Sequence, residues 1–461
     1  MMVNFWIYDV SFLILFSIFV VWFLSSRKKD LSRDGIVFMY RTKFGIKAIN
    51  YIGDKFKKTL YSLRYFIIGL GFALMGVMLW MLGQTVSLYL MHPEITKLIK
   101  APPIAPLIPY FPKLFGMQNY FPPFYFVYFI LALAVVAIVH EFSHGIFMKL
   151  FKIKIKSTGL VFLGPILGAF VEQDDKSFKS KKKIERMTVL GAGVFANIIF
   201  ALIFYGLYVG FFFTSFTASG YMFNSYGMGL ISSENITGIY NSTEGWKEIT
   251  TDDGNYYLNE KLVYQLDNNN REYLVVYPES PAVLARMRGI IIQADDVKIT
   301  GQDTLREFLE NKNPGDTATF TTKENGETIE YNIILGEHPE NSSKPYLGVG
   351  HGTASRSGII QRILGIFMSF KDESTLYEPI WNEGIVYFIY NLFWWIMVIN
   401  LLVALFNMMP LGALDGGQFF YLAMLGIFKS KKTAKKISKI AGLIILLSFI
   451  LMMVFWFIRI L

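Results

Sequence analysis

Residues 138–144 read Ile-Val-His-Glu-Phe-Ser-His, an HExxH pattern inside a hydrophobic run that is long enough to cross a membrane. Residues four apart on a helix share a face, so His140 and His144 can bind one metal ion while Glu141 faces the same space as a general base. The chain has only five histidines, and polar side chains in a spanning helix are costly and usually functional. The alternative is polar residues that pair with one another to hold a bundle together, which requires no such spacing.

The composition is typical of a polytopic membrane protein. Of the 461 residues, 53% are hydrophobic and only 17% are charged. The absence of cysteine excludes disulfides, thiolate zinc sites and a cysteine nucleophile, so a metal must be held by histidine and carboxylate groups. The net charge of +9 comes from lysines and arginines at the ends of apolar stretches. This placement indicates membrane topology rather than nucleic-acid binding.

Six apolar stretches are long enough to span a bilayer. They are residues 4–24, 65–90, 124–150, 187–213, 385–409 and 437–461. The first lacks the basic start and the cleavage site of a signal peptide, so we expect a retained helix. The dense basic runs lie in 25–64, 151–186 and 410–436, which predicts that these segments are cytoplasmic. The N-terminus and the loops 91–123 and 214–384 would then be external, in a multi-pass protein of the cell membrane.

Two of the predicted cytoplasmic segments have unusual composition. Residues 159–170 are apolar but too short, and too interrupted by Gly and Pro, to span as a helix. We expect a re-entrant hairpin there, shielded by the bundle. The stretch 34–58 is basic and amphipathic, and two interpretations remain open: it lies on the inner leaflet, or it is a solvated linker.

A catalytic zinc site needs a third protein ligand besides His140 and His144. The other histidines, His92, His338 and His351, fall in predicted external segments. Asp415 instead follows the fifth span, at the cytoplasmic depth expected for the two motif histidines. Gly416-Gly417 would let backbone come close to it. The alternative role for Asp415 is a cap on the helix that follows.

Residues 407–417 read N-x-x-P-x-x-x-L-D-G-G. With HExxH on another span, this motif resembles the site-2 protease family of intramembrane zinc metalloproteases. The resemblance implies that His140, His144 and Asp415 bind zinc and that Glu141 activates the water. For Asn407 it implies a contact with the substrate backbone or the oxyanion.

A further motif of that family, G-x-x-x-N, matches residues 193–197. Two roles for Asn197 remain open. It belongs to the catalytic centre, as the motif implies, or it forms a hydrogen bond between packed spans. The small residues at 191–193 suit such close packing equally well.

The segment 214–384 has the composition of a soluble domain, with many polar residues and with short stretches of alternating polar and apolar residues that predict strands. Asn325-Gly326 separates two of these strands and predicts a hairpin. Ser280-Pro281-Ala282 and the strands after it, within about 275–350, resemble a PDZ domain, which many site-2 proteases place externally. PDZ domains usually have a glycine-aspartate step before the buried strand. At that place this sequence has Gln293-Ala294-Asp295-Asp296. Residues 214–270 lie outside this resemblance and have no firm assignment; a partial or second unit of the same kind is one interpretation.

We therefore expect an α-helical polytopic membrane protein of about six transmembrane helices with an inserted extracytoplasmic PDZ-like α+β domain. Its parts would be N-terminal helices and loops (1–123), a first catalytic half (124–213), the insert (214–384) and a second catalytic half (385–461). The expected function is intramembrane zinc proteolysis of transmembrane substrates, in regulated intramembrane proteolysis. The further partners would be the lipid bilayer and a peptide ligand of the insert, without nucleic acid. The alternatives are a non-proteolytic metalloprotein such as an ion transporter, and a PDZ scaffold with an inactive site.

Overall fold

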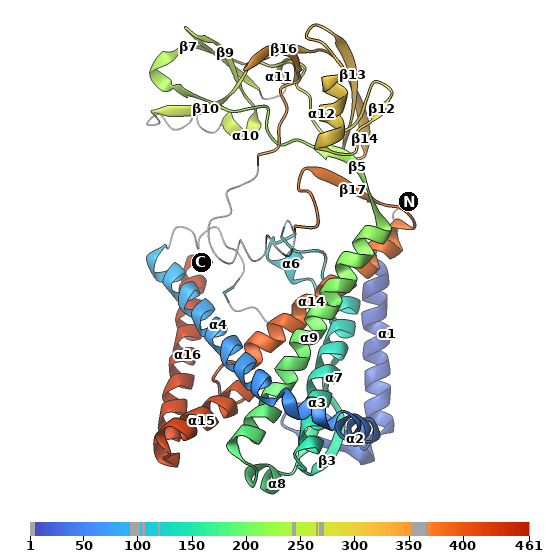
Figure 1. Ribbon diagram of the computed structural model, residues 1–461, viewed down its shortest axis with the longest axis vertical. Coiled ribbons are helices and arrows are strands. Elements are labelled where there is room, and N and C mark those ends of the chain that lie inside the picture. The colour runs from blue at the N-terminus through green and yellow to red at the C-terminus, as the bar shows by residue number, and fades with distance from the viewer. Residues whose placement is uncertain are drawn as a thin grey trace. The chain divides into compact units, whose positions relative to one another are not determined.

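The chain forms two compact units (Figure 1), one of residues 1–211 with 384–461 and one of residues 212–383. The computed structural model describes residues 5–92, 102–103, 107–118, 120–241, 246–263, 266, 272–352, 365, 367 and 369–460. The first unit is mainly helical and the second is built from β-sheets with short helices. The predicted helical membrane protein with an inserted α+β domain is confirmed.

Six helices in the described part of the chain are long and apolar enough to cross a membrane. They are α1 (Phe5–Ser26), α4 (Arg64–Met91), α7 (Phe126–Leu150), α9 (Lys183–Ser215), α14 (Glu383–Asn407) and α16 (Lys431–Ile460). Each overlaps one of the predicted spans over most of its length. The helices α9 and α16 begin several residues earlier than the apolar pattern indicates, because their first turns are basic and amphipathic rather than apolar.

Short helices lie between the long ones in the helical unit. They are η1 (Lys28–Asp30), α2 (Ile46–Lys55), α3 (Lys57–Ser62), α6 (Phe111–Leu114), α8 (Asp175–Lys179) and α15 (Asp415–Phe428). At 14 residues, α15 is too short to span a bilayer. It follows α14 after a tight turn and begins at one of the predicted metal ligands.

A four-stranded antiparallel sheet completes the helical unit. Its strands are β1 (Leu31–Asp34), β2 (Val37–Thr42), β3 (Ile155–Leu163) and β4 (Ile166–Gln173), in the order β1-β2-β3-β4. The hairpin predicted at 159–170 is present as β3 and β4, with Gly164 at a φ of +56° in its turn. Its position at membrane depth stays a prediction.

The solvated-linker interpretation of residues 34–58 is wrong for the first part of that stretch, and its place on the inner leaflet stays a prediction. Residues 37–42 form β2, which pairs with β3 so that Phe38 lies opposite Phe162. An alternating strand segment beside an apolar hairpin gains backbone hydrogen bonds that neither a surface helix nor a linker provides. Only the later residues, 46–55, form an amphipathic helix, α2.

Two apolar clusters hold the long helices together. One surrounds the C-terminal half of α7 and contains Phe147, Leu190, Met408 and Phe419, so that it joins α7, α9, α14 and α15. The other surrounds the start of α7 and includes Phe124, Phe129 and Trp395. These clusters fix α7 at both ends.

Asp9 anchors the first helix to the start of α7. Its buried carboxylate accepts hydrogen bonds from the backbone N–H groups of Phe126 and Val127, at 2.8 and 2.9 Å. The hydroxyl of Tyr110 donates to the same carboxylate. These N–H groups belong to the first turn of α7 and have no partner within the helix, so Asp9 satisfies them.

The main sheet of the inserted unit has the path β14-β13-β11-β5-β17 with β12 beside β11. Its strands are β5 (Phe216–Met222), β11 (Ile290–Ala294), β12 (Val297–Lys298), β13 (Thr317–Glu324), β14 (Glu327–Ile334) and β17 (Thr375–Pro379). The helices α11 (Pro281–Leu284) and α12 (Gln302–Glu310) and the hairpin of β15 (Gly336–His338) and β16 (Asn341–Tyr346) accompany it. The turn predicted at Asn325-Gly326 joins β13 to β14, with both residues at positive φ.

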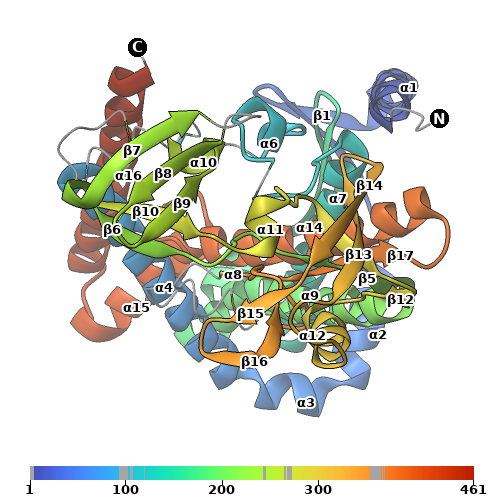
Figure 2. The same ribbon diagram turned by 90° about the horizontal axis from the view of Figure 1, so that it is seen from above.

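The unassigned residues 214–270 contribute mainly to a second antiparallel sheet (Figure 2), in the order β6-β10-β9-β8-β7. Its strands are β6 (Gly229–Ser232), β7 (Ile236–Asn241), β8 (Lys247–Thr251), β9 (Gly254–Leu258) and β10 (Tyr273–Pro278), with η2 (Ser233–Asn235) and α10 (Glu260–Val263) in the connections. Ile249, Leu258 and Val276 are fully buried in its own apolar cluster.

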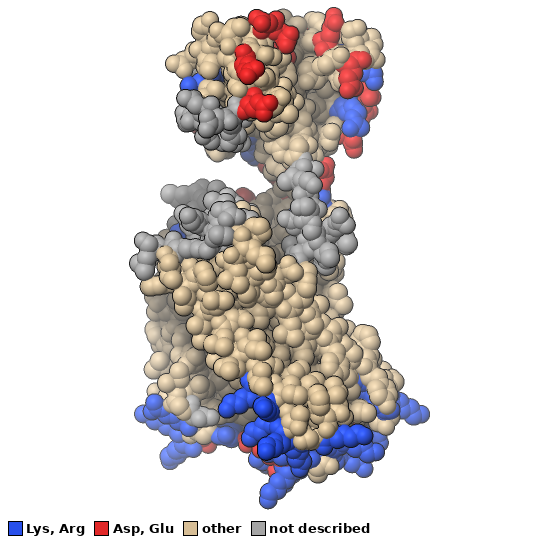
Figure 3. Space-filling view, turned by 90° about the vertical axis from the view of Figure 1, so that its left-hand side faces the viewer, with Lys and Arg blue, Asp and Glu red and all other residues tan. Residues whose placement is uncertain are grey.

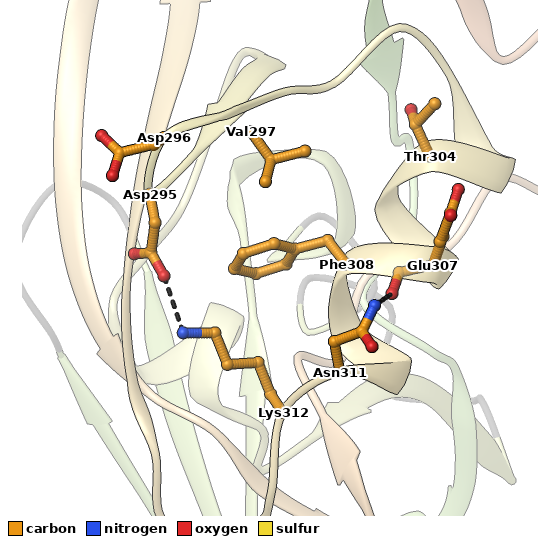
Figure 4. A pocket seen from close by; sticks show the side chains of 8 residues that line it. All are labelled: Asp295, Asp296, Val297, Thr304, Glu307, Phe308, Asn311 and Lys312. Atoms are coloured by element: carbon orange, nitrogen blue, oxygen red, sulfur yellow. Dashed lines mark hydrogen bonds and ion pairs between the residues drawn. The ribbon is translucent and has the colours of Figure 1, made fainter.

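Residues 293–296 differ from the glycine-aspartate step of PDZ domains, and the contacts of Asp295 explain how the fold accommodates the difference. Asp295 has a φ of +47°, a conformation that favours glycine. Its carboxylate accepts hydrogen bonds from the Thr319 backbone N–H and from Lys312, both at 2.8 Å (Figure 4). These two bonds offset the backbone strain, and the Lys312 ammonium lowers the pKa of the Asp295 carboxyl.

Candidate metal centre

The helix α7 presents both motif histidines on one face, one turn apart. His140 and His144 are each 7% exposed, and their Nε2 atoms are 3.1 Å apart. Both lie in the C-terminal half of α7, where the large apolar cluster packs around the helix. Two imidazole nitrogens thus converge on one point in a buried environment.

Asp415 brings a carboxylate to the same point from α15. Its Oδ2 is 3.1 Å from Nε2 of His140 and 3.1 Å from Nε2 of His144. It is the first residue of α15, and the preceding Leu414 makes no side-chain cap. The carboxylate therefore faces the histidines and does not cap the helix.

Two glycines allow the chain to turn back at Asp415. A Cβ atom on Gly416 would collide with the backbone of Met408, and one on Gly417 with the backbone of Leu411. The end of α14 and the start of α15 therefore pack backbone against backbone. Because Gly416 and Gly417 have no side chains, this close packing is possible and places Asp415 at the depth of the histidines.

The three groups fit a zinc ion in number, type and spacing. They form the one His/Asp/Glu cluster of metal-site geometry found among the described residues. Two ligands of a tetrahedral zinc, with bonds of about 2.0–2.1 Å, are about 3.3 Å apart. The observed separations of 3.1 Å are close to that value. Two histidines and a carboxylate also form a ligand set known from catalytic zinc sites, in which a fourth position stays open.

The second ring nitrogen of each histidine is also held. His144 donates from Nδ1 to the backbone oxygen of Val189 at 2.7 Å, which leaves its Nε2 free to bind a metal. The amide of Asn197 lies 3.1 Å from Nδ1 of His140. Asn197 is fully buried and its Oδ1 has no hydrogen-bond partner. After a half-turn of the amide, this oxygen accepts the Nδ1 proton of His140, as a metal-binding histidine requires.

Glycine 193 lets α9 approach the histidines. A Cβ atom there would lie 2.5 Å from Nε2 of His144 and 2.6 Å from Cε1 of His140. Next to it, Ser143 of α7 donates its hydroxyl proton to the backbone oxygen of Ala192 at 2.8 Å. The motif residues Gly193 and Asn197 thus form one wall of the site. Gly193 leaves room for the imidazole rings because it has no side chain, and Asn197 contacts His140 through its side-chain amide.

Glu141 contacts the sheet rather than another helix. Its Oε2 accepts a hydrogen bond of 2.9 Å from the backbone N–H of Val171 in β4. Because β4 is an edge strand, this N–H points away from β3 and toward α7. The carboxylate beside the metal ligands is therefore tied to the free edge of the sheet.

Asn407 completes the group of predicted site residues. It is the last residue of α14, and its Nδ2 lies 3.4 Å from Nε2 of His140. Four of the five predicted site residues, His140, His144, Asn407 and Asp415, thus meet in one place. The fifth, Glu141, is next to His140 in the chain, and its carboxylate contacts β4. The three remaining histidines take no part in the cluster.

Sequence reasoning missed three contributions to the site: the backbone groups of Val171 and Val189, and the missing side chain of Gly193. Backbone groups leave no residue signature, because any residue except proline carries an N–H group. Gly193 was visible as part of the G-x-x-x-N motif, and the small residues around it gave the signal for close packing.

Comparisons with known proteins follow this geometry. A sequence model of peptidase family M50 matches residues 128–452, which contain every residue of the cluster. An uncharacterized protein of Methanocaldococcus jannaschii is 32% identical over 206 residues, 42% of this chain and 50% of that protein. A putative zinc metalloprotease of Fusobacterium nucleatum is 26% identical over 340 residues, 68% of this chain and 88% of that protein. The aligned part of the chain thus spans half the length of the first relative and most of the second.

Proposed function

The chain belongs to peptidase family M50, the site-2 protease family of membrane zinc metalloproteases, and from this we propose that it cleaves transmembrane segments of other membrane proteins. The observation that carries the proposal is the buried cluster of His140, His144 and Asp415 with Glu141 beside it. The cluster lies on or next to helices that are long and apolar enough to span a bilayer. Peptide hydrolysis at such a place must act on membrane-embedded chains.

His140, His144 and Asp415 would hold the zinc ion. Bound there, zinc lowers the pKa of water and polarises the scissile carbonyl group. Val189 and Asn197 keep the two imidazole rings in the orientation and tautomer that the metal needs. Asn197 is therefore a positioning residue in this proposal.

Glu141 acts as the general base and then as the general acid. Its Oε2 is held by the Val171 N–H, so the carboxylate has a fixed place beside the cluster. The group takes a proton from the attacking water and passes it to the leaving amine. Asn407, whose amide borders the cluster, donates a hydrogen bond to the developing oxyanion or to the substrate backbone.

The outer edge of β4, which pairs with no further strand among the described residues and holds Glu141 at Val171, offers a place for the substrate backbone. A transmembrane helix hides its peptide bonds in internal hydrogen bonds, so the segment must unwind before cleavage. An unwound segment that adds to β4 as a further strand lies beside Glu141, because Val171 of β4 is hydrogen-bonded to the Glu141 carboxylate.

The variants Ala169→Pro and Ala169→Ser test this docking edge and leave the Val171 N–H that holds Glu141 in place. Residues two apart on a strand turn their N–H groups to the same edge, so proline removes the next N–H along that edge, whereas serine keeps it. We expect a large loss of cleavage in the proline variant alone, with zinc content and thermal stability close to wild type in both. Equal cleavage by a folded proline variant would exclude strand addition at β4.

The inserted unit contains a groove that suits a peptide. It has a volume of about 550 Å³ and lies between α12 and residues 343–349. Its lining combines apolar side chains such as Leu305 and Leu347 with the cations Arg306 and Lys344. This supports a PDZ-like domain that binds an apolar chain end with its carboxylate.

Two uses of the insert remain open: it binds a substrate or regulatory peptide, or it is a size filter that admits only substrates already trimmed of their external domain. Substrates that carry or lack that domain distinguish the two. If the groove binds the trimmed end, Arg306→Glu lowers cleavage of the trimmed substrate, while Arg288→Glu, a change outside the groove, does not. If the insert is a size filter, replacing it with a short linker lets the enzyme cleave untrimmed substrates. The outcome assigns the role.

The proposed orientation places the N-terminus outside and the metal centre near the cytoplasmic face. It is supported by the lysines and arginines that gather at one end of the helical unit (Figure 3). Because the chain has no cysteine, a single cysteine introduced at Ala48 is the one thiol in the protein. Its labelling shows on which side of the membrane Ala48 lies. We expect impermeant thiol reagents to label it only after the cytoplasmic face is opened.

The direct test uses purified protein in vesicles with a transmembrane reporter. We expect cleavage within the reporter's spanning segment, located by mass spectrometry, with loss on chelation and recovery on addition of zinc. Metal-dependent ion flux without cleavage would favour the transporter alternative. Peptide binding by the insert without either activity would favour a scaffold.

A further inference from the structure

The helix α2 packs directly behind the metal-binding turn of α7. Ile49 is fully buried, and a Cβ atom on Gly145, the residue after His144, would lie 2.7 Å from its Cδ1. One turn further on, Gly53 lies against the stem of Lys149 in the same close manner. The position of α2 therefore affects the position of the turn that carries the metal ligands.

The other face of α2 and the adjoining α3 carries cations and aromatic rings. The lysines exposed there are Lys47, Lys55, Lys57 and Lys58. Phe44, Tyr51 and Phe56 are 86%, 60% and 47% exposed beside them. The acid on α2, Asp54, is paired with Lys149 of α7 at 3.2 Å. The outward face is therefore strongly basic and rich in exposed rings.

This face lies where a membrane surface is expected. The helix α3 ends at Ser62, and the spanning helix α4 begins at Arg64. The Arg64 guanidinium lies over the rings of Tyr61 and Tyr65, at 3.9 and 4.5 Å from their centroids. Aromatic rings beside basic side chains at the end of a span are typical of the lipid headgroup region. Lysines there are attracted to anionic lipids.

We propose that α2 and α3 form a binding surface for anionic phospholipid headgroups, and that lipid bound there holds α2 against α7 and raises the cleavage rate. The lysines supply the attraction and the rings enter the headgroup layer. Ile49 and Gly145 transmit the position of α2 to the turn that contains His144. The effect on cleavage rests on the proposed protease function, whereas lipid binding itself does not.

The first experiment measures lipid contact without any proteolysis. Ala48 is exposed on α2, and in this cysteine-free chain Ala48→Cys carries a fluorophore at a single place. The labelled full chain is reconstituted in phosphatidylcholine vesicles with or without phosphatidylglycerol. We expect a blue shift and quenching by lipid-bound quenchers only with phosphatidylglycerol, both reversed by high salt. Identical spectra in the two vesicles would overturn the proposal.

The second experiment compares two variants in the same vesicles, each with four lysines replaced by glutamine. One replaces Lys47, Lys55, Lys57 and Lys58 with Gln, and its control replaces Lys431, Lys432, Lys435 and Lys436. The control lysines are also exposed, but they belong to α16, which packs on α15 and α4. We expect phosphatidylglycerol to raise cleavage several-fold in the wild type and the control, and not in the α2–α3 variant.

The two readouts keep the proposals separate. A lipid-dependent spectrum without cleavage in any vesicle would leave the lipid surface intact and count against the protease function. An equal increase of cleavage in both charge variants would refute the coupling through α2. A label that responds to an acidic polypeptide such as polyglutamate and not to phosphatidylglycerol would assign the surface to a protein partner and overturn the lipid proposal.

Discussion

The helical unit and the inserted unit place their polar groups in opposite ways. In the helical unit, polar side chains such as His140 and Asn197 are buried and converge on one centre. In the inserted unit, the buried polar side chains of the described residues are serine and threonine hydroxyls such as that of Thr322, and ion pairs such as Arg288–Glu324 lie near the surface. Buried polar groups cost stability unless they are paired. The first unit thus gathers buried imidazole, carboxylate and amide groups at one centre, whereas the second keeps its charged groups near the surface.

The largest expected effect comes from removing the carboxylate ligand. Asp415→Ala leaves two imidazoles without the third ligand, so we expect loss of bound zinc and of measurable cleavage. Zinc content by atomic emission and reporter cleavage measure this. The control is Asp303→Ala, an exposed carboxylate of the insert, which should keep both. Full zinc occupancy in Asp415→Ala would remove this residue from the site.

A methyl group at the wall of the site should have the next largest effect. Gly193→Ala places a carbon within 2.7 Å of both imidazole rings. Displacing the rings should lower kcat/KM about 100-fold, as misplacements of catalytic groups do. Gly206→Ala on the same helix is the matched control, because its added carbon meets open space. Similar rates for the two variants would show that α9 does not shape the site.

Asn197 gives a smaller effect, because it acts through His140. Asn197→Leu removes the partner of Nδ1 and should lower zinc affinity about 10- to 100-fold. Asn197→Asp keeps an oxygen that accepts the proton and should restore most of the affinity. Competition with a zinc chelator measures both variants. If Asp and Leu behave alike, Asn197 serves only the packing between helices.

The smallest effect is expected in the inserted unit, at Asp295. The Lys312 ammonium and the Thr319 N–H lower the pKa of its carboxyl. A depressed pKa stabilises the fold above the unfolded value, near 4, and this contribution is lost as the pH falls through the folded pKa. Asp295→Asn should cost about 1 kcal/mol at neutral pH and weaken the loss of stability on acidification.

Proteolysis of the insert on heating, at pH 7 and below pH 4, measures that change. Asp296→Asn is the control, because the neighbouring carboxylate points away from Lys312 (Figure 4). We expect no change in cleavage of the membrane reporter in either variant. A loss of cleavage in Asp295→Asn would contradict the separation of chemistry and stability between the two units.

The sequence predicted the spans and the site because both depend on side-chain type. Long apolar runs indicate spanning helices, and the HExxH spacing places His140 and His144 on one face. Asp415 could be found because topology and the absence of cysteine left few other ligands. Its partner histidine His140 is 275 residues away, so this contact followed from counting membrane crossings and from no local pattern.

Other features depend on backbone groups and on long-range pairing, which the sequence pattern does not reveal. The pairing of β2 with β3 joins residues 38 and 162, and no local signal links them. The Val171 N–H that holds Glu141 is a backbone group. The five-stranded sheet of the insert was not predicted, because its strands are only four to six residues long and their order depends on long-range pairing.

The variant Glu141→Gln isolates the proton transfer at the metal centre, because glutamine keeps an oxygen to accept the Val171 N–H but cannot take a proton. Zinc content and reporter cleavage are measured on the same purified sample. We expect zinc at the wild-type level and a cleavage rate lower by about 100- to 10,000-fold, the usual contribution of a general base. Cleavage at the wild-type rate by the zinc-loaded variant would contradict this expectation.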